Sequence, residues 1–211
     1  MIDAIALAIP AQSDQSFKFD LPDTGLAELE VRIDVKDALA LDNRAFTLVG
    51  SPRKARVLVV SEGNRYLSDT WKTPLAEQRA EVTMITPEAA KAEGSTRATS
   101  AGNYDLVIYD GVRPEQAPEA NALYFGAFPP GAAFDTPKDL EQPAILDWNV
   151  AHPLMQYVRD LSTIRILKAQ TIDPPPGSTT LIETNGGPIA FVFPRGGFID
   201  AVIGFSAHGQ P

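Results

Sequence analysis

The run Arg56-Val57-Leu58-Val59-Val60 sets the fold class, because it is short, continuous and rich in β-branched residues. Runs of this kind are typical of parallel strands that are covered on both faces. The polar turn Ser61-Glu62-Gly63-Asn64 follows it. After the turn, Leu67, Trp71 and Leu75 recur at the spacing of one helix face. The segment therefore predicts a strand, a turn and a helix.

The same alternation continues downstream. Pro74 predicts a kink or restart of the first helical stretch. Thr86-Pro87-Glu88 offers a helix N-cap, a proline at the first helical position and early negative charge. Further strands are predicted at 80–85, 104–109 and 121–126. Strands alternating with helices predict an α/β fold with a doubly wound sheet over residues 54–150.

Both flanking regions are predicted to be antiparallel β structure. In residues 1–49, Leu29, Val31, Ile33 and Val35 alternate with charged residues, which indicates a half-buried strand. The strands expected in this region are 2–9, 16–20, 27–35 and 45–49. Because a complete β-sandwich has about seven strands, these four predict a partial one.

Residues 151–211 are expected to add antiparallel strands that extend or cap the parallel sheet. Asn185-Gly186 is a strong hairpin signal between two of these strands. The expected strands are 163–169, 179–183, 188–193 and 198–205. The chain is therefore expected to hold two domains, 1–49 and 54–211. No closing helix follows the last strand, so we expect the natural chain to continue at both ends.

The order of segments resembles the region after the von Willebrand factor A domain in bacterial membrane proteins of the Bat-like, aerotolerance type. The most distinctive matching piece is the run from Asp37 to Ala45, DALALDNRA. The weaker pieces are Arg56 to Val60, Tyr104 to Gly111, Trp148 to Leu154, and Gly187 to Ala190. The resemblance covers most of the chain. It implies the tail of an immunoglobulin-like module followed by a class I glutamine-amidotransferase-like, flavodoxin-like domain, within a longer chain associated with the bacterial inner membrane.

Composition narrows the range of functions. The net charge is −9 over 211 residues, which argues against sequence-independent binding of nucleic acid. There is no cysteine and there are only two histidines, His152 and His208, so neither a thiolate nor a multi-histidine metal site is expected. No stretch has the roughly 18 apolar residues of a membrane span. We therefore expect no metal and no cofactor, and a chain that does not itself cross the membrane.

We expect no catalytic residues. Active members of the amidotransferase fold use a cysteine nucleophile, and this chain has none. Ser61 follows a strand, but its neighbours Val60 and Glu62 do not form a nucleophile elbow. His152 precedes Pro153 and is expected to start a short helix from Pro153 to Val158, which favours a structural role over that of a general base.

A ligand site is the alternative, since ligands collect at the carboxyl ends of strands in open α/β sheets. It would support binding of a small molecule or nucleotide, or a hydrolase activity. No glycine-rich nucleotide motif accompanies this crevice. The candidate residues are Ser61, Glu62, Gly63, Asn64, Asp110, Gly111 and Gly126.

The leading hypothesis is a non-catalytic interaction or scaffolding region that binds other protein subunits. Residues 1–49 would leave an apolar face and a strand edge uncovered, so we expect this sheet either to dock on the α/β domain or to be hidden in a homodimer through this region, and we favour the homodimer. The apolar, proline-rich stretch from Phe125 to Phe134 is either part of a contact surface or a loop folded over the sheet edge.

Overall fold

The computed structural model describes residues 4–6, 8, 10, 27–35, 39, 41, 43–49, 53–92, 102–158 and 160–206. The chain divides into two compact units, Met1–Arg53 and Lys54–Pro211. Among the described residues, no helix is long and apolar enough to cross a membrane.

The first unit contains a β-hairpin in its described part. Strand β1 (Ala27–Arg32) pairs antiparallel with β2 (Arg44–Val49), which confirms two of the expected strands, although β1 ends three residues before the predicted 35. The described residues of the expected strand 2–9 are not in a strand, and 16–20 lies outside the described residues. Leu29 is half-buried, whereas Val31, Ile33 and Val35 are exposed.

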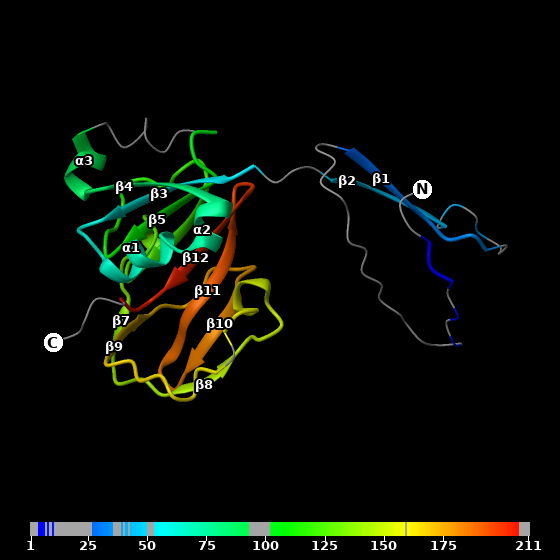
Figure 1. Ribbon diagram of the computed structural model, residues 1–211. Coiled ribbons are helices and arrows are strands. Elements are labelled where there is room, and N and C mark those ends of the chain that lie inside the picture. The colour runs from blue at the N-terminus through cyan, green and yellow to red at the C-terminus, as the bar shows by residue number, and fades with distance from the viewer. Residues whose placement is uncertain are drawn as a thin grey trace. The chain divides into compact units, whose positions relative to one another are not determined.

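The second unit is a mixed α/β structure built on an eight-stranded sheet, shown in Figure 1. Its parallel part holds β4 (Ala80–Ile85), β3 (Ala55–Ser61), β5 (Leu106–Asp110) and β6 (Asn121–Phe125), in that order across the sheet. This confirms the predicted α/β class, and it places the two apolar strands β3 and β5 next to each other. The order is compatible with a doubly wound sheet.

Antiparallel strands extend the sheet beyond β6. β12 (Phe198–Ile203) pairs parallel with β6. β11 (Gly187–Arg195), β10 (Thr179–Thr184) and β8 (Ile145–Trp148) then follow in antiparallel order. The predicted hairpin at Asn185-Gly186 is confirmed, since it joins β10 to β11.

Two short strands were not predicted, and one was misplaced. β7 (Lys138–Glu141) pairs antiparallel with β9 (Lys168–Thr171) in a separate two-stranded sheet. The strand predicted at 163–169 is therefore wrong in most of its length. β7, β8 and β9 have four residues each, which is too short for an alternating pattern to be recognised.

Helices cover both faces of the parallel strands. α1 (Arg65–Trp71) and α2 (Pro74–Arg79) are separate helices, which confirms the restart predicted at Pro74. Leu67 and Trp71 of α1 pack on the face that carries Val57 and Val59. Ala90 of α3 (Pro87–Ala92) packs on the opposite face with Leu58 and Val60. Single 3-10 turns occur at Ala132–Phe134 (η1) and Pro153–Met155 (η2).

The core of the second unit follows the β3–β5 pair. Val57, Leu58, Val59 and Val60 are at most 2% exposed, and Val107 and Ile108 of β5 are equally buried. Leu106 is only half-buried because it lies at the start of β5, where the sheet meets solvent.

We expect Val59→Asp to abolish soluble expression, because an unpaired charge at a position with 0% exposure costs several kcal/mol. Leu75→Asp is the matched control, since the same kind of change at a side chain with 63% exposure should leave folding intact. Circular dichroism during thermal unfolding provides the measurement. A cooperative Val59→Asp variant with an unchanged melting temperature would contradict the assignment of β3 to the sheet centre.

Candidate functional site

The carboxyl ends of β3 and β5 lie where the sheet topology changes direction. From β3 the chain passes through α1 and α2 to β4, and then returns through α3 to β5 on the other side of β3. Ligands in open α/β sheets bind in the crevice at such a point. Two groups of residues lie here, one on each face of the sheet.

The first group is a buried hydrogen-bond network on the α1 face. The Ser61 hydroxyl donates to Asp110 Oδ2 at 2.6 Å, and the Asn64 side-chain amide donates to Asp110 Oδ1 at 3.2 Å. The Ser61 oxygen also accepts the backbone N–H groups of Gly63 and Asn64. The three side chains are between 1% and 6% exposed. Both carboxylate oxygens of Asp110 are therefore paired inside the protein.

The same asparagine begins the first helix. Asn64 Oδ1 accepts the backbone N–H groups of Tyr66 and Leu67, at 3.0 and 3.2 Å. An N-cap of this type satisfies amide groups that have no partner within the helix. Asn64 therefore ties the start of α1 to the end of β5, and the turn Ser61 to Asn64 is held from both sides.

The other four predicted site residues do not join this network as side-chain groups. Glu62, Gly63 and Gly111 are exposed around it. Gly126 follows β6, and its N–H donates to the Ile203 carbonyl at 2.8 Å. It has a φ of 62°, and a Cβ at this position would lie 3.0 Å from Ser206 Cβ. We therefore assign Gly126 to the junction of β6 with β12.

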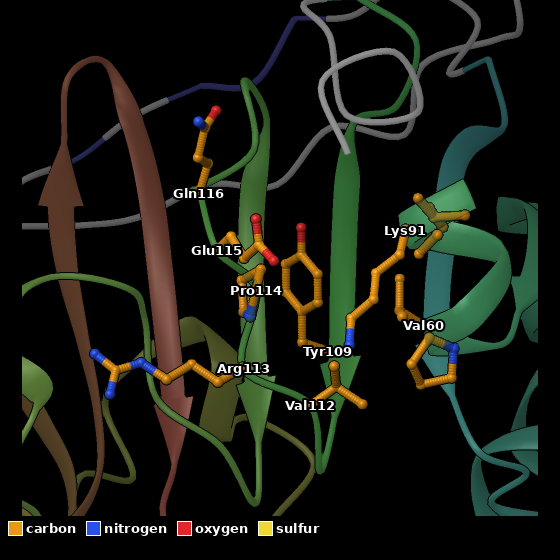
Figure 2. A pocket seen from close by; sticks show the side chains of 11 residues that line it. Val60, Lys91, Tyr109, Val112, Arg113, Pro114, Glu115 and Gln116 are labelled. Carbon is orange, nitrogen blue, oxygen red and sulfur yellow. The ribbon is translucent and has the colours of Figure 1, made fainter. Parts of the chain in front are cut away.

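The second group is a pocket of about 120 Å³ on the α3 face. Leu58, Val60 and Tyr109 line it from the sheet, while α3 and residues 112–116 form its sides. In Figure 2, Lys91 extends from α3 toward β5, Glu115 approaches from the other side of the Tyr109 ring, and Arg113 points away. Arg113 instead pairs with Asp135 at 2.6 Å.

This pocket offers an apolar floor with one ammonium and one carboxylate group at its rim. Lys91 and Glu115 are both exposed. The candidate residues predicted from the sequence lie at the same strand ends, but none of them lines this pocket, because Lys91 and Glu115 lie in segments with no motif.

A buried ion pair lies on the same face of the sheet, between β11 and β12. Arg195 donates to both oxygens of Asp200, at 2.6 and 3.1 Å, and also to the Ala120 carbonyl at 2.9 Å. The Asp200 side chain is completely buried. Burial raises the pKa of its carboxyl group, and the hydrogen bond and charge of Arg195 offset part of this effect.

Two stacked tyrosines lie near this ion pair. The Tyr109 and Tyr124 rings are 5.4 Å apart with an angle of 13° between their planes. Burial raises the pKa of Tyr109 to about 12, while Arg195 acts in the opposite direction. Burial, together with the charge of Asp200, also raises the pKa of Tyr124 above its ordinary value. Both phenols therefore stay protonated to a higher pH than an exposed tyrosine does.

Sequence analysis missed the Arg195–Asp200 pair and the stacked tyrosines. The sequence offers one signal for the ion pair. Arg195 and Asp200 lie on either side of a Gly-Gly turn, and a hairpin brings residues on its two strands into cross-strand contact. His152 was expected to be structural, and its Nδ1 accepts the Leu154 N–H at 3.2 Å, which caps the 3-10 turn η2. This turn ends at Met155, three residues before the predicted Val158.

Comparisons with known proteins give one distant likeness. No family model matches the chain, and no curated protein matches it. Among solved structures it is similar to Cytoplasmic Protein STM1381 from Salmonella typhimurium LT2. The identity is 12% and the TM-score is 0.46, over 88% of this chain and 86% of that chain. At these values the likeness carries no argument about function.

We expect Asn64→Ala to lower the free energy of unfolding by about 2–3 kcal/mol, because it removes a helix cap and a buried hydrogen bond to a carboxylate. Thr73→Ala is the control: Thr73 caps the exposed α2, and its loss should cost about 1 kcal/mol. Urea unfolding measures both. Equal losses for the two variants would show that the bond from Asn64 to Asp110 contributes no stability.

The raised phenol pKa values predict a loss of stability at high pH. Unfolded tyrosine ionises near pH 10, so a folded pKa raised to about 12 contributes stability that is complete below pH 10 and is lost as pH rises toward 12. In a titration followed at 295 nm, two of the five tyrosines should ionise late. Tyr109→Phe should reduce the late phase, and Tyr157→Phe, at a side chain with 84% exposure, should leave it unchanged.

Proposed function

We propose that this chain is a non-catalytic interaction or scaffolding region of a larger, membrane-anchored bacterial protein that binds other protein subunits. The observation that carries the proposal is a series of six exposed apolar side chains between residues 146 and 167, in the segment that begins in β8 and leads into β9. These side chains have exposed fractions between 45% and 84%, and they are Leu146, Val150, Leu154, Tyr157, Ile164 and Leu167.

The 146–167 segment is unusual because its exposed apolar residues are close together in sequence, and backbone hydrogen bonds order the part from 148 to 158. Backbone hydrogen bonds link Val150 to Trp148, His152 to Asn149, Met155 to His152, and Val158 to Met155. Single exposed apolar residues are normal on a protein surface, whereas a concentration of them marks interaction sites. A surface of this kind supports binding of another protein.

The stretch from Phe125 to Phe134 does not supply this surface. Phe128 and Phe134 are 4% and 7% exposed and belong to the main core cluster. Phe134 also packs against Phe193 with ring centroids 5.5 Å apart. Of the two interpretations left open by the sequence, the loop folded over the sheet is therefore correct for these aromatic residues.

The hydrogen-bond network at the ends of β3 and β5 supports a structural role for these residues. The Ser61 hydroxyl donates to Asp110 and accepts two backbone N–H groups, and it is 6% exposed. A nucleophile must instead reach a substrate in an accessible site. These hydrogen bonds of Ser61 instead stabilise the turn between β3 and α1.

We also propose a domain type and a protein family for this chain. The order β4-β3-β5-β6 supports a flavodoxin-like, class I glutamine-amidotransferase-like domain. Together with the Asp37 to Ala45 run, it supports a place in Bat-like proteins at the bacterial inner membrane. The homodimer through residues 1–49 also stays a prediction, and the exposed Phe46 and Leu48 of β2 support it.

Site-specific photo-crosslinking in cells of the native host tests the proposal. Benzoylphenylalanine replaces Tyr157 in one variant and, as a control, Tyr66, whose side chain is 66% exposed and lies on α1. We expect a discrete protein adduct from position 157 and none of that size from position 66. The absence of an adduct at position 157, in a variant with unchanged thermal unfolding, would overturn the proposed surface.

A further inference from the structure

One edge of the large sheet is open in the described part of the chain. β8 stands at the end of the strand order and pairs with β10 alone. A strand at an edge presents backbone N–H and C=O groups that can pair with another chain. Such an edge can bind an extended peptide, which then becomes an additional strand.

Two acidic residues stand directly opposite each other at this edge. Asp147 of β8 is the register partner of Glu183 of β10. Like charges in this position are unfavourable unless a cation lies near them. Among the described residues, no ion pair involves either carboxylate. The pair therefore leaves local negative charge that a basic side chain can neutralise.

The residue before Asp147 on β8, Leu146, is apolar rather than acidic. The register passes from the pair Asp147–Glu183 to the pair Ile145–Thr184 through a β-bulge, so Leu146 is the residue of the bulge that has no register partner on β10. Leu146 is 64% exposed, and Val150, just beyond the strand, is exposed to the same extent. An incoming strand would therefore meet a carboxylate and an exposed apolar side chain at neighbouring positions of β8.

We infer that β8 accepts, as an added strand, an extended segment of a partner protein that carries both basic and apolar side chains. This inference rests on the proposed interaction function and names the chemistry of its partner. A second copy of the same edge is a poorer fit, because antiparallel self-pairing would bring together four carboxylates from two chains that each carry a net charge of −9.

The test uses the full chain and synthetic peptides. The probe is an eight-residue peptide of alternating valine and lysine, and binding is followed by amide hydrogen exchange and by calorimetry. We expect slower exchange at residues 145–148 and no change at 80–85, which form β4 at the other edge of the sheet. A peptide of alternating valine and glutamate should not bind, and neither should the valine–lysine peptide with N-methylated backbone amides.

Paired substitutions separate local recognition from attraction to an acidic protein. Asp147→Asn with Glu183→Gln should weaken binding of the lysine peptide about three- to tenfold, the range expected for two partly exposed ion pairs. Glu77→Gln with Glu81→Gln is the matched control, since it removes the same charge near β4 and should leave the affinity unchanged. Equal weakening by both pairs would overturn the inference.

The outcomes also separate this inference from the proposed function. Protection of the β8 amides that depends on the two carboxylates supports strand addition. If the N-methylated peptide binds equally well, or if no peptide protects residues 145–148, strand addition at β8 is wrong. An adduct at position 157 in the photo-crosslinking experiment would then still support an interaction surface, with another type of partner segment.

Discussion

The parallel pairing of β3 with β5 is the constraint on which the second unit depends. Val57 to Val60 are buried on both faces, so each face requires its own cover. α1 covers one face through Leu67 and Trp71, while Ala90 of α3 packs on the other, in a cluster that also contains Phe128 and Phe134 from the chain after β6. Burial of the β3–β5 pair stabilises the α/β part by about 25 cal/mol for each Å² of apolar surface removed from water. The register of β3 with β5 then determines which residues at the two strand ends lie opposite each other.

That register explains why polar residues at the strand ends meet. Ser61 and Asp110 are register partners, and each ends its strand on the α1 face. Their hydrogen bond, together with that from Asn64, closes the turn and begins the helix. The opposite face of the same strand ends carries Tyr109 and the pocket between α3 and residues 112–116 (Figure 2). One crevice of the fold is thus divided by the sheet into a closed polar side and an open, mainly apolar side.

The antiparallel half of the sheet has a different character. β12 joins it to the parallel half, and Asp200 of β12 forms an ion pair with Arg195 of β11 near the stacked tyrosines. Toward β8 the strands become short and the apolar side chains turn to solvent. The open edge, the exposed apolar groups and the Asp147–Glu183 pair are the features that support the proposed contact with another chain. The sheet interior thus supplies rigidity, and its outer edge supplies the proposed contact.

The amino-acid sequence alone determined the strands and helices of residues 54–126, because apolar runs, Pro74 and the Thr86-Pro87 cap are local signals. It also identified Ser61, Asn64 and Asp110, since parallel strand ends meet at one edge. Only the tertiary structure decided that these groups are buried and bonded to each other, because burial depends on α1 docking. It also decided the edge position of β8, the pairing of Asp147 with Glu183 and the ion pair of Arg195 with Asp200. These depend on sheet order and register between distant segments, and local sequence patterns do not encode them.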